Sequence, residues 1–401
     1  MSVALDNVVV LDLTSTFWAS VASALLGDFG ADVIKIESLD PAERRFPDEI
    51  TPHEPGSWNY RFDLANRNKR SASVDLESED GREVVRRLLA KADIVVTDAA
   101  SAVLKRHGLD YASVSAVRSD VIYVRGTTCG PRGKDADLPP LDEIAAARAG
   151  MMPILPQPGE PPVYPGHGQM YTSVMLAFGA VAALYHRRAT GEGQEVDASL
   201  LAGNMYGASL DLQAFLAIGG ERFLQPVSRL DAGNPMSGTQ YPTSDGLWVT
   251  LTMPDTDRWW PVLAEITGLD AADPRFADHE LRCGDNRLEL MRVLDQAFRK
   301  QSAAYWRDLF NEKQISADII EDYNYPADDD VARENRYILD LQDPSLGPTS
   351  MLGFPIFMTD TPAVFARAAP RLGQHTAEVL QSLLGYAPAR VTELVRQGVI
   401  R

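Results

Sequence analysis

The chain has 401 residues, enough for two or three domains, and its apolar (45%) and charged (23%) fractions are those of an ordinary globular protein. A formal charge of −18 argues against nucleic acid and anionic membranes as partners. Two cysteines are too few for a disulfide framework, and there is neither a signal-peptide pattern nor an apolar run of about 20 residues, so we expect a cytoplasmic protein.

The first part of the sequence alternates short apolar runs with segments of helical periodicity. Residues 8–13 are predicted to form a buried strand, residues 18–29 a helix that ends before Gly30, and residues 32–36 the next strand. A helix at 80–91 and strands at 71–76, 94–96 and 121–125 continue the pattern. The fold class we expect is therefore α/β with a doubly wound sheet. No G-x-G-x-x-G follows the first strand, so a nicotinamide or flavin site has no support.

The stretch 166–173, GHGQMYTS, lies just ahead of a predicted amphipathic helix at 176–188. A glycine-rich turn before a helix exposes backbone N–H groups and the positive end of the helix dipole, which suits a reactive carboxylate or an oxyanion. The residue at the exposed tip of this turn is Gln169, an amide. Residues 161–191 contain no Asp or Glu, so we expect no acidic residue close to Gln169.

The composition changes after residue 201. Residues 202–219 are rich in Ala and Leu and predicted to be helical, and residues 231–252 read as strands of a hairpin. Helices are predicted at 255–267, 286–299 and 303–314. These elements indicate a second, smaller α+β domain.

The segments GQMYTS (168–173), GAVAAL (179–184) and TGEGQEVDASLL (190–201) resemble, in one register, the signature of the class III CoA-transferases, the formyl-CoA transferase and carnitine CoA-transferase family. Further blocks, among them NRNKRSASVDL, DPRFADHELRCGDNRLEL and LGQHTAEVL, extend the resemblance over nearly the whole chain. It implies a large doubly wound domain from 1–200 and 330–401, an inserted small domain at 225–325, and linkers at 201–224 and 326–329. It also implies an intertwined dimer.

In this family the Asp of the glycine-rich turn is the nucleophile that takes the acyl group and then CoA. Gln169 fills its position, so the resemblance implies no catalytic residue in this chain. Asn66, Lys69 and Arg70 are the inherited candidates for anchoring the CoA phosphates; the alternative is a solvated basic turn. We expect no metal site and no permanently bound cofactor, with CoA and acyl-CoA as substrates of a complex.

Two other family motifs are altered. Where relatives carry ENFRPG, residues 97–102 read TDAASA, and Asp98 adds a negative charge where a polyanionic ligand would lie. The family's GVPCGPV becomes QISADI at 314–319. Leu141 stands where the related racemases carry a His ahead of Asp142, which argues against racemase chemistry.

These departures favour a non-catalytic subunit of a class III CoA-transferase complex, paired with a homologous subunit that carries the catalytic Asp. The benzylsuccinate CoA-transferases are similar in having two family members in one complex. Such a complex would move CoA from an acyl-CoA such as succinyl-CoA to an aromatic or branched dicarboxylate. Two alternatives stay open: an active acyl-CoA-processing enzyme with relocated chemistry, and a non-enzymatic acyl-CoA-binding protein.

Overall fold

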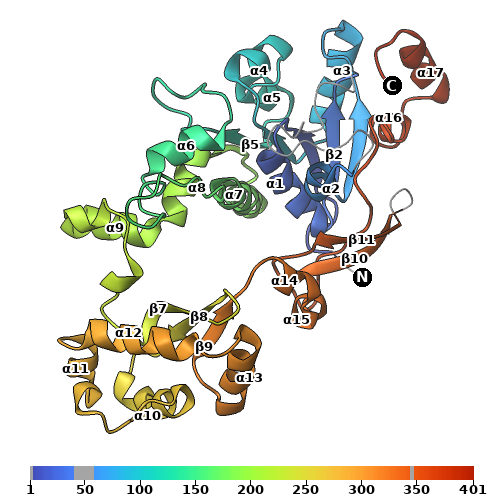
Figure 1. The fold of residues 1–401 in the computed structure, drawn as a ribbon. Helices are drawn as coiled ribbons and strands as arrows, with labels where there is room; N and C mark the ends of the chain where they lie inside the picture. Colours follow the sequence, from blue (N-terminus) through green and yellow to red (C-terminus); the bar gives the residue numbers. More distant parts are fainter. Residues whose placement is uncertain (1–2, 40–57, 344–346) are drawn as a thin grey trace. The chain divides into compact units, whose positions relative to one another are not determined.

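The computed structural model describes residues 3–39, 58–343 and 347–401. The chain divides into two compact units (Figure 1). Unit 1 comprises Met1–Pro153, Pro162–Phe223 and Arg336–Arg401, and unit 2 comprises Ile154–Pro161 and Leu224–Asn335. Most of the segment expected as a linker, 201–224, therefore belongs to unit 1, where it forms helices.

Among the described residues, the main sheet of unit 1 has six strands, all paired in parallel. Their order is β3-β2-β1-β4-β5-β6. The strands are β1 (Val9–Leu13), β2 (Asp32–Glu37), β3 (Lys69–Ser73), β4 (Ile94–Thr97), β5 (Ile122–Thr127) and β6 (Gln194–Ser199). From β1 the chain builds outward to β3 and then returns to add β4 on the other side. This doubly wound order, which confirms the predicted fold class, places a topological switch point between β1 and β4.

Helices cover both faces of the sheet, which is why its central strands are apolar on both sides. Leu11 and Ile34 face the layer that contains α3 (Glu79–Leu89), α4 (Ser101–His107), α5 (Tyr111–Val117), α16 (Thr376–Leu384) and α17 (Pro388–Arg396). Val10 and Val33 face the opposite layer, which contains α1 (Phe17–Asp28), α6 (Asp142–Ala149), α7 (Gly168–Thr190) and the start of α8 (Leu200–Gly207). Neighbouring residues of one strand thus serve two separate cores.

The C-terminal end of the chain is fixed to β3. The backbone N–H of His375 donates to the carbonyl oxygen of Ser71 (2.9 Å), and the backbone N–H of Ser73 donates to the hydroxyl of Thr376 (3.1 Å). Unit 1 also contains α2 (Tyr60–Asn66), α9 (Ser209–Ile218) and the hairpin of β10 (Ile338–Asp343) and β11 (Gly347–Leu352). Both ends of the chain therefore contribute to one unit.

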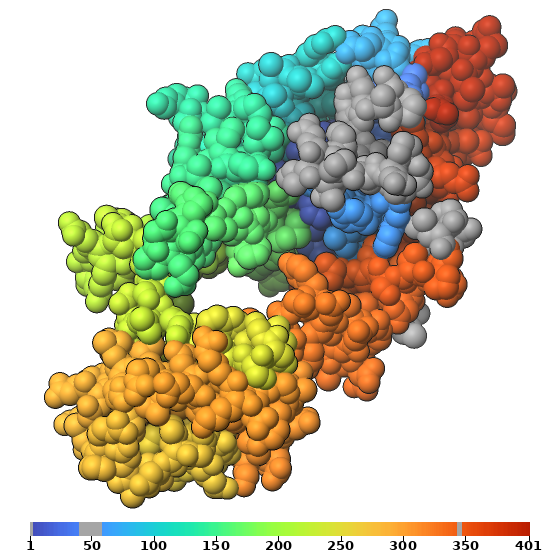
Figure 2. All heavy atoms as spheres, viewed as in Figure 1, coloured from blue at the N-terminus to red at the C-terminus, as the bar shows by residue number. Residues whose placement is uncertain are grey.

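Unit 2 is a small α+β body, coloured from yellow-green to orange in Figure 2. Its antiparallel sheet consists of β7 (Ser237–Pro242), β8 (Trp248–Thr252) and β9 (Ala317–Ile320). Its helices are α10 (Thr256–Thr267), α11 (His279–Cys283), α12 (Arg287–Phe298), α13 (Ala303–Lys313), α14 (Asn324–Asp328) and α15 (Asp330–Glu334). Aromatic rings fill its core: Phe298 lies with its ring centroid 5.3 Å from Tyr241 and 4.9 Å from Trp306. In the described parts of the chain, no helix has the length and apolar character to cross a bilayer.

Candidate functional site

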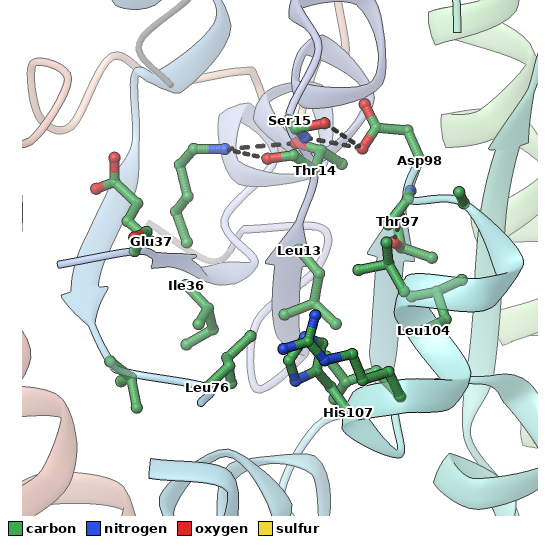
Figure 3. Close-up of a pocket in the computed structure, with 18 of the residues that line it drawn as sticks. Leu13, Thr14, Ser15, Ile36, Glu37, Leu76, Thr97, Asp98, Leu104 and His107 are labelled. Atoms are coloured by element: carbon green, nitrogen blue, oxygen red, sulfur yellow. Dashed lines mark hydrogen bonds between the residues drawn. The ribbon is translucent and has the colours of Figure 1, made fainter. Parts of the chain in front are cut away.

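A cavity of about 640 Å³ opens at the carboxyl ends of the central strands of unit 1. Leu13 of β1, Ile36 of β2 and Thr97 of β4 reach it from the sheet, and Leu104 and His107 of α4 close one side (Figure 3). The crevice between β1 and β4 is where doubly wound sheets bind their ligands, because the loops that follow the two strands leave in opposite directions. The cavity is therefore the candidate ligand pocket of unit 1.

The described residues that line this pocket carry more negative than positive charge. They include the basic residues Lys35 and Arg106 and four acidic residues, Glu37, Asp75, Glu77 and Asp98. Both cations have protein partners. Arg106 Nη2 lies 2.5 Å from Glu77 Oε2, and the buried Lys35 Nζ donates to the carbonyl oxygen of Thr14 (3.0 Å). The electrostatic character of this lining suits neutral or cationic groups better than phosphates.

Asp98 follows β4 and reaches the N-terminus of α1. Its Oδ1 accepts the backbone N–H of Ser15 (2.8 Å), and its Oδ2 accepts the backbone N–H (2.7 Å) and the hydroxyl (2.5 Å) of Thr16. The Ser15 hydroxyl lies 3.2 Å from Oδ1. Figure 3 shows the carboxylate of Asp98 directed at Ser15. A charged side chain from the end of β4 thus binds the turn that joins β1 to α1.

The three candidate CoA anchors lie at the start of β3 and in the helix before it. Lys69 is 0% exposed: its Nζ lies 2.6 Å from Asp12 Oδ2 and donates to the Ser20 carbonyl oxygen (2.8 Å) and to Asn66 Oδ1 (3.0 Å). Asn66 Nδ2 also donates to the backbone carbonyl oxygen of Phe62 (3.0 Å). Arg70 pairs with two carboxylates, Asp32 Oδ2 (2.5 Å) and Glu378 Oε1 (3.1 Å).

The interpretation of these residues as a solvated basic turn is wrong, because Asn66 at the end of α2 and Lys69 and Arg70 at the start of β3 are all buried. Burial alone would raise the pKa of Asp12, but the ammonium groups of Lys35 and Lys69 hold it well below its usual range. The ion pair between Lys69 and Asp12 therefore belongs to the interior of the fold. CoA binding by Asn66, Lys69 and Arg70 stays a prediction.

Gln169 lies in the first turn of α7, because that helix begins at Gly168 and not at residue 176 as expected. The hydroxyls of Thr172 and Ser173 are satisfied within this helix, because they donate to the carbonyl oxygens of Gly168 and Gln169 (both 2.8 Å). The side chain is half-buried and not at an exposed tip. Its Nε2 lies 3.4 Å from the hydroxyl of Tyr164.

An acidic residue lies close to Gln169, contrary to the expectation from the sequence. The hydroxyl of Tyr164 donates to Asp142 Oδ2 (2.6 Å), and Asn204 Nδ2 donates to Asp142 Oδ1 (2.7 Å). Asp142 is 2% exposed and belongs to α6, which the fold brings against α7 and α8. Burial, and after it the hydrogen bond to Asp142, raises the pKa of Tyr164 above its ordinary value.

The chemistry available at this cluster is limited by its hydrogen bonds. Both carboxylate oxygens of Asp142 accept a hydrogen bond, and the residue is closed to solvent. Gln169 presents a neutral, resonance-stabilised amide, which cannot attack a thioester to form an anhydride. Sequence reasoning missed Tyr164 altogether, since a tyrosine in a proline-rich loop gives no signal of its partner.

The sequence of the chain matches the model of CoA-transferase family III over residues 5–376. Among similar curated proteins, the cinnamoyl-CoA:phenyllactate CoA-transferase of Clostridium sporogenes is 28% identical over 97% of this chain and 95% of its own length. A succinate–glutarate CoA-transferase of Agrobacterium fabrum is 30% identical over 94% of this chain and 95% of its own length.

Among solved structures, a CAIB/BAIF family protein from Brucella suis superposes with a TM-score of 0.82 and 26% identity, covering 96% of this chain and 100% of that one. Sequence and fold thus agree over nearly the full length. The chain belongs to CoA-transferase family III.

Proposed function

We propose that this chain is the non-catalytic subunit of a heteromeric class III CoA-transferase, whose partner subunit carries the nucleophilic Asp. The observation that carries the proposal is the amide of Gln169 at the position that the resemblance assigns to the nucleophile. The family reaction needs a carboxylate that attacks an acyl-CoA thioester, with release of the CoA thiolate and formation of a mixed anhydride. Losing such a covalent step costs several orders of magnitude in rate, roughly 6 kcal/mol or more.

The exposed surface of α7 supports a partner subunit. Val174, Phe178, Val181 and Tyr185 follow one another at helical spacing, and Phe178 and Tyr185 are 74% and 79% exposed. We call these four residues the α7 stripe. Large apolar side chains gathered on one helix face of a lone chain are typical of a surface that another subunit covers. We propose that the homologous subunit covers the α7 stripe, in the intertwined arrangement that the family resemblance implies.

The substrates proposed for the complex are an acyl-CoA donor such as succinyl-CoA and a carboxylic acid acceptor. The names of two relatives, one acting on succinate and glutarate and one on phenyllactate, support dicarboxylates and aromatic acids as acceptor classes. CoA enters and leaves as a substrate in this reaction, and we expect no permanent cofactor. A cytoplasmic location is part of the same proposal.

The test is to express the chain alone and together with a homologue that carries G-D-x-x-T-G. We expect the pure chain to show no turnover with succinyl-CoA and a panel of carboxylates, and the co-expressed pair to form a stable mixed complex that is active. Native mass measurement gives the composition, and hydroxylamine trapping of the thioester locates it on the partner. Gln169→Asp in this subunit should leave the activity of the complex unchanged, as should the control Gln169→Asn.

Gln169→Asp tested on the chain alone provides the decisive outcome. We expect no restored turnover, because the new carboxylate would lie beside Asp142 and the pocket between β1 and β4 would keep its acidic lining. Full activity of Gln169→Asp homodimers would overturn the heteromer proposal, since only the nucleophile would then have been missing.

A second candidate is an active enzyme with relocated chemistry. It rests on the short path from Gln169 to Asp142, in which the Tyr164 hydroxyl contacts both side chains. It predicts turnover by the pure chain that Asp142→Asn abolishes while Gln169→Asn does not. Turnover with both properties would replace the first proposal by the second.

A further inference from the structure

Three charged side chains form a buried cluster between α1 and the main sheet. Asp12 of β1, Lys35 of β2 and Lys69 of β3 lie on neighbouring strands, on the face of the sheet that α1 covers. The exposed fractions of these residues are 0%, 2% and 0%, respectively. Charged groups are rarely buried so completely unless they are paired, because the interior stabilises an ion much less than water does. We call these three residues the lysine cluster.

Two lysines share one carboxylate in the lysine cluster. Lys69 Nζ lies 2.6 Å from Asp12 Oδ2, and Lys35 Nζ lies 3.6 Å from Asp12 Oδ1. Within the described residues, the other acceptors of both amines are neutral. Each amine donates to the hydroxyl of Ser20 in α1 (3.0 and 3.2 Å), and Lys69 also donates to Asn66 Oδ1 (3.0 Å). With both lysines protonated, the cluster therefore holds one positive charge more than it has negative charges.

The elements around the cluster do not balance this charge. Their further charged residues are Asp28 of α1, Asp32 and Glu37 of β2, Arg61 and Asp63 of α2, and Arg70 of β3. The carboxylate of Glu37 attracts the Lys69 ammonium, but less strongly than Asp12 does. In the part of the chain that the structure describes, Lys35 and Lys69 form ion pairs with Asp12 and with no other carboxylate.

Loss of one proton removes the excess charge. Burial, the largest cause, and the ammonium of Lys35 lower the pKa of Lys69 from its ordinary 10.5 to about 7, against the attraction of Asp12. Because the two lysines are coupled, the lost proton belongs to the pair. The unfolded chain keeps this proton up to about pH 10.5. Between about pH 7 and 10.5 the folded state therefore gains stability as the pH rises, and this gain is lost as the pH falls to 7.

We propose that the lysine cluster is a pH-sensitive device that holds α1 firmly on the sheet when one lysine is neutral and loosens it when both lysines are charged. Separation of α1 from the sheet lets water reach the second ammonium, which offsets the cost of its burial. Lys35 also donates to the carbonyl oxygen of Thr14, and both residues line the pocket between β1 and β4. The device goes beyond the proposed function, since it needs neither a partner subunit nor a bound ligand.

Lysine-selective ¹³C labelling with NMR detection tests the inference, because the chain contains only seven lysines. In the folded wild type we expect one lysine signal to titrate near pH 7. Lys35→Met and Lys69→Met each leave one cation for Asp12, so each should remove this titration or move it upward by at least about one pH unit. The control, Lys91→Met, removes an exposed lysine of the same unit and should leave the titration unchanged.

Amide hydrogen exchange measures the loosening of α1. After correction for intrinsic exchange rates, the protection of α1 amides in the wild type should be at least about tenfold lower at pH 6 than at pH 8.5. In Lys35→Met the two values should agree within about threefold, as should those of α12 of unit 2 in the wild type.

Three outcomes would overturn the inference: no lysine that titrates below pH 9, a titration near pH 7 that both methionine variants retain, or protection that changes equally in α1 and α12. The first and the third are measured on the wild type alone. The test therefore stands even where a methionine variant does not fold.

Discussion

At the scale of single residues, the large unit keeps several charges in its interior and satisfies them in different ways. Asp12 receives the ammonium groups of two lysines, and Asp142 receives a tyrosine hydroxyl and an asparagine amide. Asp197 of β6 is the contrasting case: its Oδ1 accepts from Thr127 (3.1 Å), while its Oδ2 is buried with no partner among the described residues. Its burial therefore costs free energy when it is ionised.

Replacement of Asp197 by Asn should stabilise the protein in a pH-dependent manner. Burial raises the pKa of Asp197 from 3.8 to about 6, so the folded protein holds a proton between these values that the unfolded chain has lost. The ionised carboxylate destabilises the fold above pH 6, and below about pH 4 both states are protonated. We expect Asp197→Asn to raise the free energy of unfolding by about 1–2 kcal/mol at pH 7.5, after allowance for partial exposure.

Urea unfolding of the wild type and of Asp197→Asn at pH 4 and pH 7.5 measures this difference. The increase in the free energy of unfolding caused by Asp197→Asn should shrink to near zero at pH 4. A gain that is equal at both values, or a loss at pH 7.5, would show that the carboxylate is not destabilised by burial.

At the scale of elements, the close approach of α7 and α8 holds Gln169 and its neighbours in place. A Cβ on Gly168 would lie 2.0 Å from Asn204 Nδ2, and a Cβ on Gly203 would lie 2.1 Å from the hydroxyl oxygen of Thr172. Glycine at both positions lets α7 and α8 pack closely and leaves room for the Asn204 amide, which donates to Asp142 of α6. The network around Gln169 therefore depends on a helix contact that no larger residue permits.

Gly168→Ala should destabilise the protein by about 2–3 kcal/mol, because it displaces Asn204 and leaves a buried carboxylate oxygen of Asp142 without its donor. The matched control is Gly233→Ala, where an added Cβ meets nothing within 4 Å. Chemical unfolding of the two variants should separate them by at least about 1.5 kcal/mol. Equal stabilities would mean that α7 and α8 move apart without cost.

At the scale of the whole molecule, the proposed assembly depends on the α7 stripe. Single exposed apolar residues are normal on a protein surface, whereas four on one helix face are typical of a surface that another subunit covers. The net charge of −18 makes copies of this chain repel one another. It therefore favours a partner subunit whose contact surface is apolar or positively charged. A single substitution in the α7 stripe should therefore change the oligomeric state.

Phe178→Glu should weaken the proposed complex by at least about tenfold, because it would place a charge where the partner subunit is proposed to cover the α7 stripe. Leu288→Glu, on α12 of unit 2, adds the same charge at another exposed apolar position and serves as the control. Light scattering over a dilution series gives the dissociation constants. If Phe178→Glu assembles as the wild type does, or both variants weaken assembly equally, the stripe is not the contact surface.

The sequence by itself determined the alternation of strands and helices, the two-part α/β and α+β character, and the resemblance to the family; the assignment of Gln169 to the nucleophile position stays a prediction. Each of these follows from local periodicity, from composition, or from motifs that lie within a few residues of one another. The start of α7 was placed eight residues too late, because the glycine-rich segment ahead of residue 176 reads as a turn while the structure continues the helix back to Gly168.

Only the tertiary structure decided which side chains meet. Asp98 reaches Ser15 across 83 positions of sequence, Lys69 reaches Asp12 across 57, and Asn204 reaches Asp142 across 62. Such pairs depend on strand order and helix packing, which bring distant segments together, and a single sequence carries no local signal of them. For the same reason the absence of Asp and Glu near Gln169 in the sequence did not mean their absence in space: α6 supplies Asp142 from the other side of a proline-rich loop.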